Sequence, residues 1–199
     1  MDFLKDIEGI VEGPTVPMAD VPMPMQGDLI KPVSVSVAID SEYHISPNFT
    51  YGQLVTTNNR NFINLNYDEG KKYINNLTRL CNEILEPIVV LIGEVPIIDS
   101  AFRCVELNTS LGASKTSQHM DAEAGDTKYR NMSLKNVFNK IADSSLPFGQ
   151  LIFEFSSWVH VSVIDNVKHP GKVHQKFTTA IQKNAFGHNE TVYIPVNHI

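Results

Sequence analysis

The chain has 199 residues, 42% of them hydrophobic, so it is long enough to bury the core of one domain of ordinary size with extensions. Its formal net charge of -6 argues against a nucleic acid or an anionic membrane surface as the partner, because both call for clustered Lys and Arg. Acids, Gly and Pro interrupt every apolar run before the roughly 20 residues that span a bilayer, so we expect no membrane span.

The first part of the chain differs in composition from the rest. Residues 1–13 have apolar side chains at helical spacing and acids where a Sec-type export signal has basic residues, so we expect a short amphipathic helix and no such signal. Residues 13–32 are rich in Pro and Met, which forbids a long helix or a central strand and indicates an extended arm. We therefore assign residues 1–45 to an N-terminal extension with a Pro/Met-rich arm.

The next expected elements are a strand, a short capped segment and a long helix. Alternating side chains predict the strand at 34–40, and Ser46 or Asn48 is expected to cap the short segment after it. Apolar side chains recur every three or four residues over 67–85, which predicts a helix that ends before Pro87.

Strands dominate the expectation for the later elements. Residues 95–102 are typical of a strand, and residues 133–144 form a second amphipathic helix with Ser133 as its cap. Two apolar, aromatic and β-branched runs, 150–155 and 158–164, predict a β-hairpin.

The C-terminal part is less regular. We expect a turn at 169–172 and an edge strand or short helix at 176–182. The polar residues 184–199 are assigned to a C-terminal tail, so the expected domain covers residues 46–183.

The segment SKTSQHMDAEAGD, residues 114–126, sets one His and several acids among small residues. A catalytic zinc ion needs three protein ligands from His and carboxylate and an open fourth position for water. His119 and Asp126 are separated by six residues, enough for a loop to reach a metal and return on the first residues of a strand. The segment is therefore a candidate zinc site.

The hairpin supplies the other candidates for this site. His160 is the candidate third ligand, because an unpaired imidazole in an apolar strand is costly. Glu154 can act beside it only if both side chains share one face of the hairpin. A two-residue turn would place the two side chains on opposite faces of the hairpin. A three-residue loop at 155–157 pairs Glu154 with Trp158 instead, so that Glu154 and His160 are diagonal neighbours on one face.

Each candidate also has a simpler interpretation. His119 in a polar loop is a surface histidine in that interpretation, and Asp126 caps a turn. His160 is then a hydrogen-bonded core histidine, and Glu154 is solvated at a strand end. Spacing alone leaves these alternatives open.

Four ordered blocks resemble the zinc D-Ala-D-Ala carboxypeptidase and endolysin peptidase family, in its phage-borne branch. The block SQHMDAEAGD, residues 117–126, is similar to the pattern Ser-x-His-x-x-Gly-x-Ala-x-Asp, and WVHVS, residues 158–162, to Trp-Val-His-Val-Ser. SAFRCVELNTSLGASKTSQH is similar to the upstream Ser-Gly-Tyr-Arg segment, and LPFGQLIFEF to the strand before the hairpin. The resemblance covers residues from about 49 to 180.

The resemblance implies roles for individual residues. His119, Asp126 and His160 are expected to bind Zn²⁺, which acidifies a water and polarises the scissile carbonyl. Glu154 is expected to be the general base that returns the proton to the leaving amine. Arg103 stands at the Arg that holds a substrate carboxylate in the family.

The neighbours of these residues carry further expectations. By default Arg103 would pair with a nearby acid such as Glu106, whereas the resemblance assigns it to the substrate. Ser117 and Gln118 are expected to orient the first ligand.

The chain departs from the family pattern in three places. Ala122 stands where the family has Gly, which implies strain if that position needs a positive φ. SAFR lacks the Gly and Tyr of Ser-Gly-Tyr-Arg, and residues 165–171, DNVKHPG, are extra. These departures concern substrate preference and rate rather than the ligands.

Together the patterns predict an α+β domain in which a small antiparallel sheet carries the zinc site and helices 67–85 and 133–144 flank it. The expected function is that of a zinc-dependent peptidoglycan peptidase, a carboxypeptidase or an endopeptidase, that cuts stem peptides or cross-links. Such an enzyme is made in the host cytoplasm and acts at the bacterial cell wall, as a phage endolysin or a virion-associated lysin. The expected partners are the peptidoglycan peptide and, through the N-terminal arm, other virion proteins.

Two alternatives stay open at this point. One is a phage structural or wall-binding protein that keeps the peptidase fold without turnover. The other is a metal-stabilised fold whose closed site takes Asp121 or Glu123 as the fourth ligand.

Overall fold

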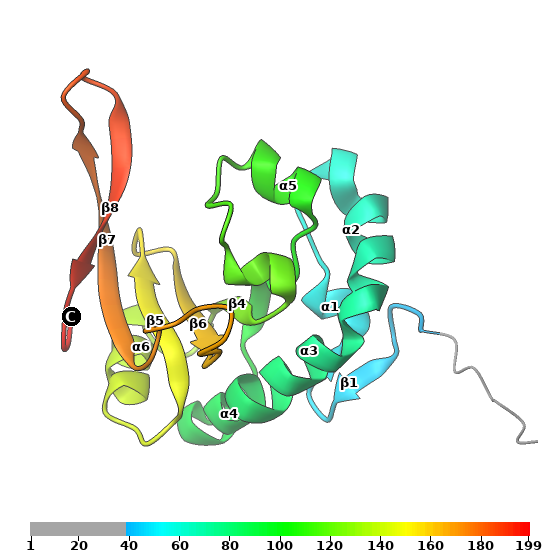
Figure 1. The fold of residues 1–199 in the computed structure, drawn as a ribbon. Helices are drawn as coiled ribbons and strands as arrows, with labels where there is room; N and C mark the ends of the chain where they lie inside the picture. Colours follow the sequence, from blue (N-terminus) through cyan, green and yellow to red (C-terminus); the bar gives the residue numbers. More distant parts are fainter. Residues whose placement is uncertain (1–38) are drawn as a thin grey trace, which may run out of the picture. The chain divides into compact units, whose positions relative to one another are not determined.

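A six-stranded sheet organises the described part of the chain (Figure 1). The computed structural model describes residues 39–199, so the helix expected at 1–13, the arm at 13–32 and most of the strand at 34–40 lie outside the described residues. The order of the strands is β3-β4-β6-β5-β7-β8. The strands are β3 (Ile97–Ser100), β4 (Ala124–Lys128), β5 (Phe148–Glu154), β6 (Trp158–Val163), β7 (Gln175–Lys183) and β8 (Asn189–Pro195).

The expected α+β class is observed, but the sheet is larger than the small antiparallel sheet of the prediction, and it is mixed. Neighbouring strands run antiparallel except β5 and β7, which run parallel. The parallel pair arises because residues 164–174 carry the chain from the end of β6 past β5 to its other side. The sheet thereby gains β7 and β8 beyond the expected hairpin.

The two faces of the sheet carry different side chains, because successive residues of a strand point to opposite faces. Val159, Val161 and Val163 of β6 belong to the hydrophobic core, on the side of the sheet that the helices cover. His160, between them in sequence, lines a cavity on the other face. Strand periodicity therefore separates the core from the candidate site.

The long helix continues through Pro87, so the prediction that it ends before this residue is wrong. Its consecutive segments are α2 (Ile63–Gly70), the 3-10 turn η2 (Lys71–Tyr73), α3 (Ile74–Leu80), the π-helical turn η3 (Cys81–Leu85) and α4 (Glu86–Ile92). Pro87 stands in the first turn of α4, directly after the π-helical turn, where proline's missing N–H removes no α-helical hydrogen bond. The helix ends at Gly93, whose φ of 79° is left-handed.

The remaining elements are short apart from one helix. They are β1 (His44–Ser46), β2 (Phe49–Thr50), α1 (Tyr51–Leu54), η1 (Arg60–Phe62), α5 (Val105–Ser110), η4 (Gln118–Asp121) and α6 (Leu134–Ala142). The predicted cap of the second amphipathic helix is confirmed, since the Ser133 hydroxyl accepts a hydrogen bond from the backbone N–H of Asn136. The predicted strand before Arg103 is also confirmed, as β3.

The cap of α1 is Thr50 rather than Ser46 or Asn48. Thr50 and Gln53 form a reciprocal capping box at the start of the helix. Ser46 and Asn48 instead donate side-chain hydrogen bonds to the Glu86 carboxylate, at 2.7 and 2.6 Å. Their hydroxyl and amide groups therefore tie the start of the domain to the long helix.

The C-terminal residues complete the sheet. β7 lies between β5 and β8, so the edge strand expected at 176–182 is an inner strand. The tail expected at 184–199 instead contains β8, which pairs with β7 along its whole length. None of the helices in residues 39–199 combines the length and apolar character that crossing a membrane requires.

Candidate metal centre

Three candidate ligands converge on the open face of the sheet. Asp126 of β4 and His160 of β6 are direct cross-strand partners, and η4 brings His119 beside them. The distance from His160 Nδ1 to Asp126 Oδ1 is 2.9 Å, and His119 Nε2 lies 3.2 Å from Asp126 Oδ1 and 3.1 Å from His160 Nδ1. We call this group the His119–Asp126–His160 centre.

The orientation of the His119 ring leaves Nε2 free to act as a ligand. Its Nδ1 lies 2.8 Å from the backbone carbonyl of Ala101, and a carbonyl can only accept, so Nδ1 carries the proton. Burial lowers the pKa of His119 to about 4, so the ring is neutral near pH 7. The orienting group is therefore the Ala101 carbonyl, rather than Ser117 or Gln118 as the sequence suggested.

Asp126 is held as a carboxylate from both sides. Its Oδ2 accepts a hydrogen bond from Arg103 Nη2 at 3.1 Å, while Oδ1 faces the two imidazoles. Burial acts to raise the pKa of Asp126, but the contacts with His119 and His160 outweigh it and hold the pKa well below its usual range. Arg103 thus pairs with Asp126, and the default pairing with Glu106 is wrong.

Glu154 shares a face of the hairpin with His160. The register pairs Glu154 with Trp158 and Ile152 with His160, so the loop has three residues and the two side chains are diagonal neighbours. Trp158 Nε1 donates a 2.6 Å hydrogen bond to Glu154 Oε2, which fixes the carboxyl group. Burial raises the pKa of Glu154, which is the direction that suits a general base.

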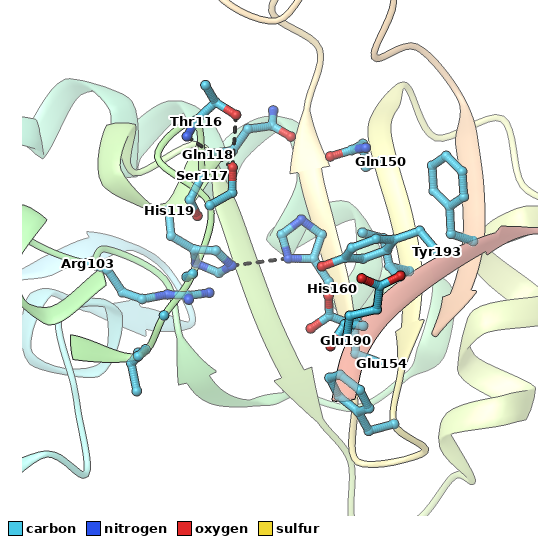
Figure 2. A pocket seen from close by; sticks show the side chains of 18 of the residues that line it. Arg103, Thr116, Ser117, Gln118, His119, Gln150, Glu154, His160, Glu190 and Tyr193 are labelled. Atoms are coloured by element: carbon cyan, nitrogen blue, oxygen red, sulfur yellow. Dashed lines mark hydrogen bonds between the residues drawn. The ribbon is translucent and has the colours of Figure 1, made fainter. Parts of the chain in front are cut away.

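A cavity of about 910 Å³ opens over the centre and Glu154 (Figure 2). Its lining comes from the loop before His119, from β5 and β6, and from the C-terminal strands. The charged and phenolic side chains around it, apart from those of the centre, are Arg103, Glu154, Lys172, Glu190 and Tyr193. The space suits an extended polar ligand that carries both amide and charged groups.

The C-terminal strands supply cavity residues that the sequence did not identify. Figure 2 shows Glu190 and Tyr193 of β8 on the same side of the cavity as Glu154. Burial, and next the Glu154 carboxylate, raise the pKa of Tyr193. No spacing signal could have found these residues, because β8 reaches the cavity only through its pairing with β7, which the crossover after β6 places beside β5.

Asp121 and Glu123 do not join the centre. They lie with His169 in a second group whose ligand atoms are within 4.8 Å of one another. Between the two acids, Ala122 has a φ of 56°, the positive value that the departure from Gly raised as a question. Because this left-handed residue turns the chain, the closed four-ligand site with Asp121 or Glu123 is not what the described residues form.

The His119–Asp126–His160 centre fits a zinc ion. Ligand atoms about 2.0–2.1 Å from zinc lie about 2.8–3.4 Å apart in octahedral or tetrahedral arrangements, and the observed separations of 2.9–3.2 Å fall within this range. One neutral imidazole and a carboxylate held in its ionised form are ready donors. Three protein ligands beside a cavity leave room for a further ligand, as catalytic zinc sites do.

Comparison with known proteins gives one finding on the family. A family model described as Peptidase M15 matches residues 48–162, which is more than half of the chain. The matched range contains Arg103, Glu154 and the whole His119–Asp126–His160 centre, and it ends before β7. No curated protein matches the chain.

Proposed function

The chain belongs to the Peptidase M15 family, and on that premise we propose that it is a zinc metallopeptidase that hydrolyses peptide bonds in peptidoglycan stem peptides or their cross-links. The observation that carries the proposal is the convergence of three ligand atoms within 3.2 Å at the wall of a cavity that Glu154 also lines. A scaffold or wall-binding surface has no physical need for this arrangement.

In this proposal His119, Asp126 and His160 hold the zinc ion. A bound zinc ion supplies Lewis-acid chemistry, since it polarises a carbonyl and acidifies a water. Glu154 accepts the proton of the attacking water and delivers it to the nitrogen of the leaving amine, so one C–N bond breaks as one C–O bond forms. Trp158 keeps the Glu154 carboxyl group aimed during both transfers.

Arg103 has two roles in the proposal. Its Nη2 group positions Asp126, and its side chain also lines the cavity. Arg103 Nε is buried and has no hydrogen-bond partner among residues 39–199, so it is available to a substrate carboxylate. Lys172 is a second cation in the lining and favours the same anionic peptides.

The biological setting is proposed from the sequence resemblance. The resemblance to phage-borne peptidases supports an endolysin or a virion-associated lysin that acts at the bacterial cell wall. The 1–45 extension is then the part that would contact other virion proteins.

The test of turnover is the release of free amines from purified peptidoglycan by the zinc-loaded protein and its Glu154→Gln variant. Loss of the base should lower the rate by about 10²–10⁴-fold while zinc stays bound. In the wild type, kcat/KM should fall as pH drops through the pKa of Glu154, at a higher pH than the value of about 4.3 for an ordinary glutamate. Glu106→Gln, an exposed glutamate on α5, is the matched control.

Two results would contradict the proposed function or the role of Glu154 in it. An active Glu154→Gln variant would mean that the base is another group. A zinc-loaded wild type that releases no amine but binds wall fragments would favour the wall-binding alternative.

A further inference from the structure

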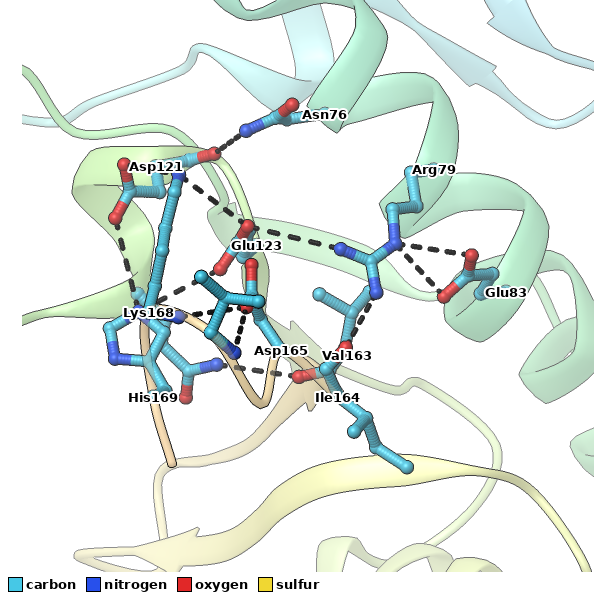
Figure 3. A network of polar contacts seen from close by, with 12 residues as sticks. Asn76, Arg79, Glu83, Asp121, Glu123, Val163, Ile164, Asp165, Lys168 and His169 are labelled. Carbon is cyan, nitrogen blue, oxygen red and sulfur yellow. Dashed lines mark hydrogen bonds and ion pairs between the residues drawn. The ribbon is translucent and has the colours of Figure 1, made fainter. Parts of the chain in front are cut away.

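A second group of His and acidic side chains takes two of its members from the segment between His119 and Asp126 (Figure 3). We call it the Asp121–Glu123–His169 cluster. Asp121 ends η4, Glu123 precedes β4, and His169 comes from the loop that follows β6. None of the three lines the cavity over the His119–Asp126–His160 centre.

Two buried atoms in this cluster lack hydrogen-bond partners. Glu123 is 3% exposed and His169 is 7% exposed. Within residues 39–199, neither Glu123 Oε2 nor His169 Nε2 has a partner. Burying such groups without a partner is costly, so the arrangement indicates a ligand that both would bind.

The two unpartnered atoms point at one another and at a third donor. His169 Nε2 lies 3.7 Å from Glu123 Oε2 and 3.8 Å from Asp121 Oδ2. These separations are too long for hydrogen bonds. They are slightly wider than the spacing of about 2.8–3.4 Å for atoms around one zinc-sized ion, and the two carboxylate oxygens lie within 4.8 Å of each other, so shifts of about 0.5–1.5 Å would complete a site.

The neighbouring cations use the other carboxylate oxygens. Lys168 Nζ binds Asp121 Oδ1 at 2.9 Å and lies 3.7 Å from Glu123 Oε1. Arg79 is held by Glu83 and by the Ile164 carbonyl, and its Nη1 is 3.9 Å from Glu123 Oε1. Oδ2 and Oε2 therefore remain for a ligand on the His169 side.

We propose that Asp121 Oδ2, Glu123 Oε2 and His169 Nε2 bind a divalent transition-metal ion at a site separate from the His119–Asp126–His160 centre. One imidazole and two carboxylates suit zinc, manganese or iron, whereas Ca²⁺ and Mg²⁺ take oxygen ligands. The ion joins the inserted loop 165–171 to the segment that carries His119 and Asp126. It therefore fixes that segment from outside the lining of the cavity.

The test is zinc binding to metal-free, tag-free, full-length protein, with bound metal counted by mass spectrometry after dialysis. The wild type should bind two zinc ions per chain, and His160→Ala and His169→Ala should each bind one. The double variant should bind none. His188→Ala, an exposed histidine in the turn between β7 and β8, should still bind two.

The outcomes separate this proposal from the proposed function. A wild type that binds one ion, lost in His160→Ala, overturns the second site and leaves the peptidase proposal intact. A single ion that His160→Ala retains and His169→Ala loses supports the second site and removes the catalytic one. Two ions in a folded His169→Ala variant overturn the assignment of His169.

A second variant keeps the proposal testable if His169→Ala misfolds, because it is expected to raise zinc affinity at the second site rather than lower it. Lys168→Met removes a cation beside the proposed ion, so zinc should bind the second site about tenfold more tightly. If the cluster is an ion-pair network only, Lys168→Met should lower stability without changing zinc binding, and that result would overturn the proposal. Glu123→Gln, which keeps the shape of the side chain, should lose the second ion.

Discussion

Two groups of His and acidic side chains take members from the segment between His119 and Asp126, and they differ in the elements that position their ligand atoms. The His119–Asp126–His160 centre has two of its ligands, Asp126 and His160, on paired strands, and its ligand atoms are within 3.2 Å of one another. The Asp121–Glu123–His169 cluster depends on a loop and has gaps of 3.7–3.8 Å with a lysine beside it. Paired strands therefore hold ligand atoms at metal-binding distance before an ion binds, whereas a loop must move to close around its ion.

The largest effect is expected from a change that disrupts the His119–Asp126–His160 centre. Asp126→Asn removes the charged ligand between the two imidazoles, so zinc affinity and amine release should fall by about 10³-fold or more. Asp121→Asn is the matched change in the second group and should alter amine release by less than about tenfold. Equal losses of amine release in both variants would mean that catalysis does not depend on the His119–Asp126–His160 centre more than on the Asp121–Glu123–His169 cluster.

A smaller effect concerns the arginine that supports the centre. Arg103→Lys keeps the charge but loses the planar fork that reaches both Asp126 and the cavity, so kcat/KM should fall by about 10–100-fold. Zinc affinity should fall as well, measured by competition with a chelator. Arg130→Lys, at an exposed position, is the control. Unchanged zinc affinity would mean that Arg103 binds the substrate but does not support the metal ligand Asp126.

The second group should respond to pH in the absence of metal. Burial, opposed by Lys168 and reinforced by Asp165, raises the pKa of Glu123 to about 7. Because the folded pKa lies above the ordinary value of about 4.3, the stabilising contribution is complete below pH 4 and is lost as pH rises through 7. Glu123→Gln should therefore be more stable than the wild type at pH 8, by about 1–3 kcal/mol, and nearly equal to it at pH 4.

Urea unfolding of metal-free protein at the two pH values measures this difference. Zinc should stabilise the wild type at pH 8 more than it stabilises Glu123→Gln. A difference between the variants that is the same at both pH values would contradict the raised pKa.

The smallest effect lies between the two groups. Ala122→Gly relieves about 1–2 kcal/mol of left-handed strain but loses a buried methyl worth about 0.8 kcal/mol and adds a backbone entropy cost of about 0.5–1 kcal/mol, so a net change within about 1 kcal/mol of zero is expected. Ala124→Gly, also buried but in β4, has no such strain to relieve and should lose stability. Denaturant unfolding of both variants compares them. A loss in Ala122→Gly as large as in Ala124→Gly would mean that the positive φ stores no strain.

Local patterns predicted the elements whose signals are local. The hairpin, β3 and the Ser133 cap follow from periodicity and capping chemistry, whereas the apolar strand around His160 left a core histidine open as an interpretation. The departure from Gly at Ala122 raised the question of a positive φ, and the observed φ of 56° answers it. The long helix was cut short because Pro87 looked like a stop, whereas a π-helical turn accommodates it.

Features that depend on long-range packing were not predictable. The Ala101 carbonyl that orients His119 carries no side-chain signal, and β8 reaches the cavity only through the crossover after β6. His169 stands in residues 165–171, which the resemblance predicts to be extra, outside the motifs that carry it. A histidine in a segment that departs from the family pattern is the one signal that could have found it.

We propose that the His119–Asp126–His160 centre is a catalytic zinc site. Zinc content and amine release from peptidoglycan, measured on the same preparations of wild type and His160→Ala, test it most directly. We expect His160→Ala to lose one zinc ion per chain and its amine release together, while circular dichroism shows that the fold is retained. Undiminished amine release in His160→Ala, or a wild type without zinc, would contradict it.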